Sequence, residues 1–151
     1  MTEIVMPQHT NALGTVFGGV VMSWVDIAAA TCAIRHCRKH VVTASIDALH
    51  FLAPIRLGYI VSIKASLNFV GSTSCEVGVK VTAEDPLTGD QHHTSSAYLT
   101  FVSLDSSGKP LIMPGLAPQT ANEKRRYGEA QIRRKNRLHL KGIIESRGTT
   151  L

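Results

Sequence analysis

The residues best suited to chemistry lie in one apolar stretch near the start of this 151-residue chain. Asp26 is the single formally charged side chain between Glu3 and Arg35, and the residues around it are almost all apolar or small. Burying an unpaired carboxylate costs free energy, so we expect Asp26 to have hydrogen-bond partners or to hold its proton more tightly than an exposed carboxylate. Such a carboxylate is suited to general-base chemistry, although the spacing alone fits a structural core network equally well.

Upstream of Asp26 the sequence offers groups that can hold a polarised oxygen. Gly18 and Gly19 are adjacent, and Gly14 lies just before them. If a helix begins at this pair, its first N–H groups have no partner inside the helix, and the missing Cβ atoms let a ligand approach closely. Asn11 adds an amide that can orient water or substrate. The plainer interpretation of the glycine pair is a tight entry into the helix, and the sequence by itself fits both.

These residues need a long helix and a sheet to position them. From Gly19 onward, apolar residues recur at helical spacing and the opposite face is apolar or small as well, which predicts a helix wrapped by other structure. The rest of the body alternates polar and apolar residues with a period of two and is divided by turns. The expected order is a strand, the helix and four long strands, over residues 2–6, 18–38, 41–52, 57–69, 75–83 and 92–104.

This order predicts an α+β fold in which a long antiparallel meander curls around the central helix. Helical crossovers between successive strands are absent from the pattern, which makes a doubly wound parallel sheet the wrong class. In the strand over 41–52 the apolar residues are expected on one face and the polar residues on the other. The two sets are Val42, Ala44, Ile46, Ala48 and Leu52, and Thr43, Ser45 and Asp47.

Charge divides the chain into a near-neutral body and a basic tail. Residues 1–118 hold seven Lys/Arg and eight Asp/Glu, a net charge of −1, and residues 119–151 hold nine and three, a net charge of +6. We therefore expect one domain over 1–118 and a basic C-terminal helical tail over 119–151. Thr120 and Glu123 fit a capping box that starts a helix over 121–140. A basic tail is compatible with binding nucleic acid or another anion, and equally with a solvated surface.

Other classes of function lack their sequence signals. The apolar stretch is interrupted by Ser23, Asp26 and Thr31 and no basic segment precedes it, so we expect a cytoplasmic protein without a signal peptide or membrane span. Three cysteines with irregular spacing predict reduced core thiols. No third ligand is suitably spaced for a metal at His36 and His40, and Walker, dinucleotide and Gly-x-Ser-x-Gly motifs are absent. We expect neither a metal nor a cofactor.

Several stretches of the body resemble the hotdog-fold acyl-CoA thioesterases, the class that includes bacterial acyl-CoA hydrolases and the cytosolic brain-type acyl-CoA hydrolase. The most specific stretch combines an Asn, a glycine pair and a helical Asp in the family's order. The stretches are HTNALGTVFGGVVMSWVDIAA, RHC, VVTASIDALHFLAPIRLGYIV, GSTSCEV and DPLTGDQHHTSSAYLTFVSLD, which together span roughly residues 1–118. The resemblance implies a hotdog fold, a helix wrapped by a curved sheet, and hydrolysis of fatty acyl-CoA to free fatty acid and CoA.

The resemblance also implies how the site is assembled. Two subunits pair their sheets and share active sites, in which Asn11 of one chain meets Asp26 of the other, and three such dimers form a hexamer. Asp26 would act as general base or nucleophile, while the N–H of Gly19, with Gly18 beside it, stabilises the oxyanion.

CoA belongs to the substrate in this scheme, and two segments are expected to hold it. The resemblance implies contacts from the turn Ser72, Thr73 and Ser74. The charge of the tail adds Arg125, Arg126, Arg133 and Arg134 as contacts to the CoA phosphates of a neighbouring subunit. Arg56 and Lys80 fit solvated surface charges better.

Two other functions stay open for a chain of this fold. Hotdog domains also serve as acyl-CoA-sensing regulatory modules attached to DNA-binding elements, but the tail EKRRYGEAQIRRKNR is short, follows the domain and lacks a second helix. A hotdog dehydratase relies on a His paired with an acidic residue, whereas the positions here are Asn11 and Asp26. We therefore expect an acyl-CoA hydrolase that binds no nucleic acid. The sequence does not specify its acyl chain length.

Overall fold

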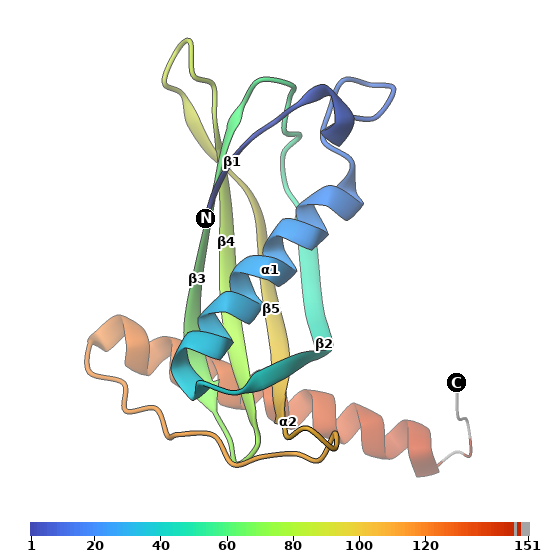
Figure 1. Ribbon diagram of the computed structural model, residues 1–151, viewed down its shortest axis with the longest axis vertical. Coiled ribbons are helices and arrows are strands. Elements are labelled where there is room, and N and C mark those ends of the chain that lie inside the picture. Colours follow the sequence, from blue (N-terminus) through green and yellow to red (C-terminus); the bar gives the residue numbers. More distant parts are fainter. Residues whose placement is uncertain (147, 149–151) are drawn as a thin grey trace.

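A long helix and an antiparallel sheet form the body of the protein in the computed structural model, which describes residues 1–146 and 148. The helix lies in the concave side of the sheet, and a second helix crosses the opposite side near one end (Figure 1). The predicted order of a strand, a helix and four strands is confirmed. The elements are β1 (Thr2–Ile4), the 3-10 turn η1 (Pro7–His9), α1 (Gly18–Cys37), β2 (His40–Phe51), β3 (Ile60–Val70), β4 (Ser74–Glu84), β5 (Gln91–Leu104) and α2 (Ala121–Ser146).

Helix α1 begins and ends close to where its residues predict. The glycine pair opens it directly after Phe17, whose backbone is extended, and no side chain caps this end. At the other end Arg38 is left-handed, with a φ of 54°, and its N–H donates to the carbonyl of Ile34. The face buried against the sheet consists of Val21, Trp24, Val25, Ala28, Ala29, Ala33 and Cys37. By length and composition α1 could cross a membrane, but its buried face belongs to the core cluster that it forms with the sheet.

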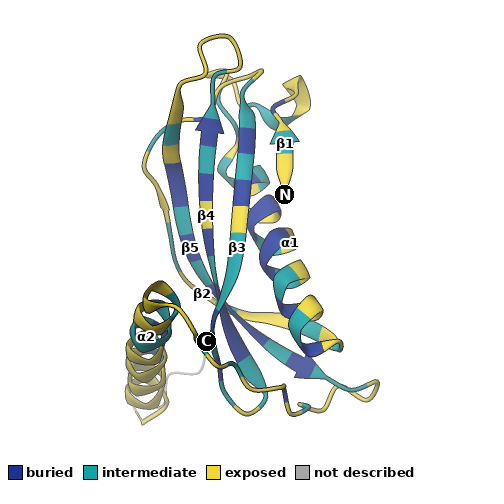
Figure 2. Cartoon of the chain, turned by 90° about the vertical axis from the view of Figure 1, so that its left-hand side faces the viewer, coloured by how far each residue is buried: buried dark blue, intermediate teal, exposed yellow. Residues whose placement is uncertain are grey.

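The opposite face of α1 is open to solvent in the single chain. Met22 is 44% exposed, Ile27 52% and Ile34 45%. Figure 2 shows exposed positions along the side of the helix that is turned away from the sheet. The prediction of a helix covered on all sides is therefore wrong for one chain, because the five strands curl around one side of it. Large apolar side chains gathered on one exposed face mark a surface that another molecule covers.

The strands lie in the order β1-β3-β4-β5-β2, and neighbouring strands are antiparallel. The predicted four-strand meander is wrong for β2, which pairs with β5 at the far edge of the sheet. The connection over 52–59 is longer than a hairpin turn and is bonded elsewhere: Val16 N–H donates to the Ile55 carbonyl at 2.8 Å, and Gly58 N–H to the Val5 carbonyl at 3.0 Å. These bonds carry the chain past the start of α1 to β3 and leave β2 as an edge strand.

Strand β2 does not follow the simple alternation expected from its sequence. Its pairing with β5 shifts register between Thr43 and Ser45 and again between Ile46 and Ala48. Each extra residue turns the following side chains toward the other face of the sheet. The prediction that the apolar residues share one covered face is therefore wrong, and Val42 and Ile46 remain 46% and 38% exposed.

The basic tail forms α2, which starts at the predicted capping box. Thr120 N–H donates to Glu123 Oε2 at 2.9 Å, and Glu123 N–H donates to Thr120 Oγ1 at 3.2 Å. Backbone N–H groups of Thr120 and Gln119 hold the pKa of the Glu123 carboxyl below its usual range. The helix continues to Ser146, past the predicted end at residue 140. The last part of the predicted tail, residues 147 and 149–151, lies outside the described residues.

Two arginines attach α2 to the outer face of the sheet. Arg133 donates from Nη2 to Glu76 Oε1 at 2.7 Å and from Nε to Oε2 at 3.1 Å, and its guanidinium lies 3.6 Å from the centre of the Tyr98 ring. Glu76 is buried. Arg137 pairs with Asp47 of β2 at 2.5 Å. The helix has thus reached the edge strand by Arg137, and Figure 1 shows its last turns extending past that edge.

Replacing Arg133 with methionine would leave Glu76 as a buried carboxylate without its charged partner. Removing one partner of a buried ion pair costs about 3–5 kcal/mol, so we expect Arg133→Met to lower the free energy of unfolding by about that amount. Urea unfolding at a fixed protomer concentration measures the change. Lys135→Met on the exposed part of α2 is the matched control. A loss below about 0.5 kcal/mol, typical of a neutral surface substitution, would show that this pair does not hold α2 on the sheet.

Candidate active site

The carboxylate of Asp26 lies on the third turn of α1 and is half-buried. Thr43 on β2 donates from Oγ1 to Asp26 Oδ1 at 2.7 Å, which confirms the prediction of a hydrogen-bond partner. Among the described residues Oδ2 accepts no hydrogen bond, so this oxygen is available to water or substrate. The arrangement suits a general base, because one oxygen is fixed in orientation while the other can accept a proton.

Thr43 is the residue that sequence reasoning missed. The alternating pattern places it only on the polar face of a strand, seventeen positions after Asp26. Thr43 is directly opposite Phe101 of β5, a core residue, so its side chain lies on the core face of the sheet. Nothing in the local sequence pattern links a strand threonine to a helical carboxylate. Only the packing of β2 beside α1 reveals the role of Thr43.

Asn11 lies in the loop that leads into α1. Its Oδ1 accepts hydrogen bonds from Leu13 N–H at 2.9 Å and from the N–H and Oγ1 of Thr15 at 3.3 and 3.2 Å. These bonds hold the loop in a tight turn and fix the orientation of the side-chain amide. Its nitrogen makes no hydrogen bond within the described residues and is exposed. Asn11 is therefore a pre-oriented donor that can serve a water or carbonyl oxygen.

The start of α1 presents backbone donors beside a groove. Val20 N–H is bonded to the Phe17 carbonyl at 2.9 Å, whereas the N–H groups of Gly18 and Gly19 have no acceptor among the described residues. A Cβ at Gly19 would lie 2.7 Å from the Phe17 ring, and one at Gly18 would lie 3.3 Å from Phe51. The glycines therefore allow close packing at this entry. The adjoining groove, of about 380 Å³, is lined by Thr15, Val16, Gly18, Val21, Phe51, Leu52, Ala53, Pro54 and Ile55.

One chain does not bring all of these groups together. Asp26 follows Gly18 by eight residues, which corresponds to about 12 Å along the axis of a helix. Asn11 lies beyond that start, and no hydrogen bond within the described residues connects it to Asp26. A carboxylate, an amide and an oxyanion donor must converge within hydrogen-bond distance of one reacting group. The single chain holds the parts but does not complete the site.

The turn predicted to hold CoA lies at the other end of the sheet. Residues 72–74 join β3 to β4, at the end opposite the start of α1 (Figure 1). The turn is held by three backbone bonds: Gly71 N–H to the Ser74 carbonyl, Met113 N–H to the Ser72 carbonyl and Ser103 N–H to the Thr73 carbonyl. The structure therefore keeps this turn away from Asn11 and the glycine pair within one chain.

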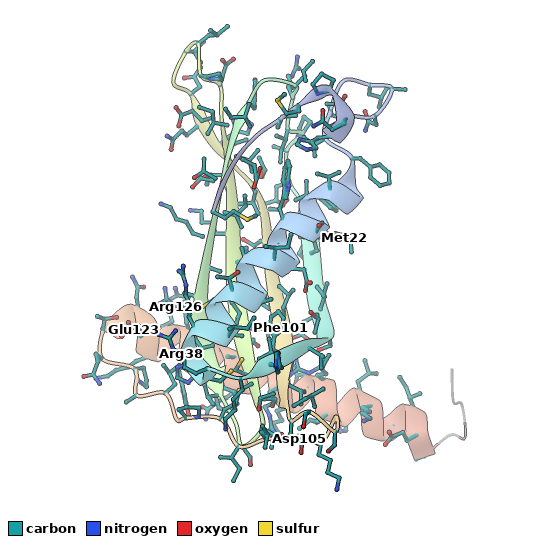
Figure 3. All side chains as sticks on the ribbon, viewed as in Figure 1. Met22, Arg38, Phe101, Asp105, Glu123 and Arg126 are labelled. Atoms are coloured by element: carbon teal, nitrogen blue, oxygen red, sulfur yellow. The ribbon has the colours of Figure 1, made fainter. Side chains whose placement is uncertain are left out.

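Two of the four tail arginines predicted to contact CoA, Arg125 and Arg126, lie on the outer side of the sheet. Arg125 pairs with Glu129 of the next turn at 2.7 Å, and both side chains are exposed. Arg126 lies near the start of α2 (Figure 3) and lines a hollow over β3 and β4. Neither arginine is brought to Asp26 within the same chain, because the sheet lies between them.

The cysteines and histidines offer no alternative site. Burial raises the pKa of the Cys75 thiol to about 12 and also raises the pKa of Cys32. A thiol that stays protonated at neutral pH is a poor nucleophile. The described residues contain no group of three His, Cys, Asp or Glu side chains suited to a metal ion. Cys75 and Cys32 are core thiols, as the sequence predicts.

Known proteins share this chain's sequence and fold. An uncharacterized acyl-CoA thioester hydrolase of Bacillus subtilis is 41% identical over 98% of this chain and 88% of its own length. A hexameric acyl-CoA thioesterase crystallised in the apo form superposes with a TM-score of 0.89, at 41% identity over 92% of this chain and 89% of that one. The acyl-CoA hydrolase of Staphylococcus aureus, solved with butyryl-CoA and CoA, gives a TM-score of 0.85 at 37% identity, covering 99% and 93%.

The Staphylococcus aureus enzyme has also been solved with an asparagine, an aspartate and a threonine each replaced by alanine. In that enzyme the aspartate follows the asparagine by fifteen positions, and the threonine follows the aspartate by seventeen. In this chain Asp26 follows Asn11 by fifteen positions and Thr43 follows Asp26 by seventeen.

The family assignment agrees with the architecture. The sequence pattern of the thioesterase superfamily matches residues 13–89, which contain the glycine pair, Asp26 and Thr43. A long helix in a curved antiparallel sheet is the hotdog fold of the matching thioesterase structures, so the predicted fold class is confirmed. The chain therefore belongs to the thioesterase superfamily.

Proposed function

We propose that this protein is an acyl-CoA thioesterase that hydrolyses fatty acyl-CoA to a free fatty acid and CoA. The observation that carries the proposal is the carboxylate of Asp26, oriented by Thr43 at 2.7 Å and spaced from Asn11 as in the Staphylococcus aureus enzyme. The class of substrate is inferred from relatives that are named acyl-CoA hydrolases. The reaction needs water and the substrate but no cofactor, and we infer that it takes place in the cytoplasm.

We infer that two subunits share each active site. The exposed apolar face of α1 lies next to β2, an edge strand with exposed apolar side chains of its own. A two-fold axis beside β2 would pair the two sheets and run the two α1 helices in opposite directions. The start of one helix, with Asn11 and Gly19, would then face Asp26 of the partner subunit. A hexameric relative supports further assembly, for which a trimer of dimers is our proposal.

The proposed reaction begins with a water held by Asn11 of the partner subunit. Asp26 takes a proton from this water while the oxygen bonds to the thioester carbonyl carbon, and the carbonyl oxygen becomes an oxyanion. The N–H of Gly19, assisted by Gly18, stabilises that charge. The intermediate then collapses and the carbon–sulfur bond breaks. The CoA sulfur takes up the proton that Asp26 removed from the water. Direct attack by Asp26 on the thioester is the variant of this scheme that forms a covalent intermediate.

The same two-fold arrangement supports a CoA site built from the partner subunit. Because the turn over 72–74 and the start of α1 lie at opposite ends of one chain, reversing the second chain brings the turn of one toward the helix start of the other (Figure 1). We propose Ser72, Thr73 and Ser74 as contacts to the nucleotide end of CoA. We also propose that Arg125 and Arg126 contact the phosphates of a CoA molecule bound at a neighbouring subunit.

No observation favours the DNA-linked sensing module. Arg133 and Arg137 of the basic tail are engaged with carboxylates of the chain's own sheet. These pairs reduce the charge that α2 can offer to phosphates of nucleic acid. The pattern of Asn11 and Asp26 also differs from the His and acidic residue of a dehydratase.

Replacing Asp26 with asparagine tests the proposed base. General-base catalysis contributes roughly 10²- to 10⁴-fold in rate, so we expect Asp26→Asn to lose turnover by about that factor while keeping its fold and oligomer size. Release of free thiol from acyl-CoAs of increasing chain length, acetyl to palmitoyl, measures the activity. Asp90→Asn, in the exposed turn before β5, is the matched control. A folded Asp26→Asn protein with wild-type turnover would eliminate Asp26 as base and nucleophile.

Replacing Thr43 with valine keeps the shape of the side chain and removes the hydrogen bond to Asp26. Because hydrogen bonds to charged groups contribute about 1.5–3 kcal/mol, we expect Thr43→Val to lower kcat by about 10- to 100-fold with little change in KM. Thr43→Ser retains the hydroxyl and should stay within a few fold of wild type. Equal activity of Thr43→Val and Thr43→Ser would mean that the hydroxyl does not position the carboxylate.

A further inference from the structure

A hollow on the outer face of the sheet brings Arg126, which is proposed above as a contact to CoA phosphates, together with two lysines that the proposed function does not use. Its volume is about 350 Å³, and it lies over β3, β4 and β5 beside the first turns of α2. The residues that line it are Lys64, Ala65, Ser66, Asn68, Gly78, Val79, Lys80, Ser96, Tyr98 and Arg126. The polar groups include three cations and three hydroxyls, and none of these described lining residues is acidic.

The strand register brings two of these cations face to face. Lys64 on β3 is directly opposite Lys80 on β4, and Lys80 is opposite Ser96 on β5. Directly opposed residues have Cβ atoms about 4.5–5.5 Å apart, and like charges at that spacing destabilise the sheet. An anion held between the two lysines would remove this repulsion. Lys80 is exposed, as expected of a solvated charge, and Lys64 opposite it is exposed as well.

The neighbouring row of the sheet forms the floor of the hollow. Ser66 on β3 is opposite Gly78, and Gly78 is opposite Tyr98 on β5. A Cβ at Gly78 would lie 2.6 Å from Nδ2 of Asn68, so the missing side chain makes room for the Asn68 amide at that point. The hydroxyls of Ser66, Ser96 and Tyr98 add donors around it.

Arg126 closes the hollow from α2. Its Nε is fully buried and has no hydrogen-bond partner. A buried donor on a cationic group without an acceptor costs free energy, which an anionic oxygen in the hollow would recover. The carboxylate of Glu76 is engaged by Arg133 and by Nδ2 of Asn68, and Oδ1 of Asn68, which lines the same hollow, is also buried without a hydrogen-bond partner.

We propose that this hollow, lined by Lys64, Lys80 and Arg126, is a binding site for a phosphate or pyrophosphate group. Three cations from separate elements, with hydroxyl donors between them, match an anion that carries several oxygens and more than one negative charge. The phosphate belongs either to a free anion or to a CoA molecule bound at a neighbouring subunit. The site itself does not depend on the proposed catalytic mechanism.

Calorimetric titration with inorganic pyrophosphate tests the site, at about 0.15 M salt so that diffuse attraction is screened. We expect saturable binding to wild type and at least tenfold weaker binding to Lys80→Gln and to Arg126→Gln. Lys135→Gln removes the same charge from an exposed part of α2 and should bind as wild type does. Absence of saturable binding, or equal weakening in all three variants, would overturn the proposal. Lys64→Gln replaces any variant that fails to fold or changes oligomer size.

Competition identifies the source of the phosphate. Displacement of pyrophosphate by CoA, but less well by dephospho-CoA, which lacks the 3′-phosphate, would assign the site to the substrate. Simultaneous binding of CoA and pyrophosphate would assign it to a free anion. The Asp26→Asn protein should bind pyrophosphate normally, so a failure of the catalytic proposal leaves this result unaffected.

Discussion

A single five-stranded sheet cannot bury every side of a helix that is apolar all round. The sheet buries the face of α1 that carries Val21, Val25 and Ala29, and leaves Met22, Ile27 and Ile34 exposed. The β2 edge beside this face is also apolar and lacks a strand partner among the described residues. Water is a poor environment for such a surface, which supports the proposed pairing with another copy of the chain. The half-assembled state of the proposed active site follows from the same constraint.

The carboxylate of Asp26 fits this environment because the fold supplies a specific partner. Thr43 reaches it from β2 at 2.7 Å, and the pairing of Thr43 with the core residue Phe101 of β5 places its side chain on the core face of the sheet. At the other end of the site, Asn11 is fixed by its own turn and the glycine pair exposes backbone N–H groups. Each group is oriented before substrate arrives, which is the condition for electrostatic stabilisation of a transition state.

The sequence was informative where structure depends on local pattern. The helix at the glycine pair, the long strands and the capping box of Thr120 and Glu123 all follow from spacing and residue type. The place of β2 in the sheet did not, because strand order depends on contacts between residues far apart. The role of Thr43 did not follow from the sequence either, because its hydrogen bond to Asp26 depends on how β2 packs beside α1.

The attachment of the tail was likewise beyond local pattern. Net charge described residues 119–151 as a basic segment, but the buried Glu76 that receives Arg133 lies 57 positions away in the sequence. An arginine that pairs with a buried carboxylate and one that faces solvent look the same in the sequence. For the candidate site, the sequence indicates Asn11, Asp26 and the glycine pair as candidates, but it does not indicate Thr43 as the partner that orients Asp26.

The central claim is that Asn11 and Asp26 act together from different subunits, and subunit mixing tests it most directly. Asn11→Ala and Asp26→Asn proteins, each inactive alone, are unfolded together and refolded, or co-expressed. Random pairing makes half of the dimers mixed, and each mixed dimer regains one of its two sites, so we predict about a quarter of wild-type activity. Mixtures that stay as inactive as the separate variants, despite proven exchange of subunits, would contradict a shared site.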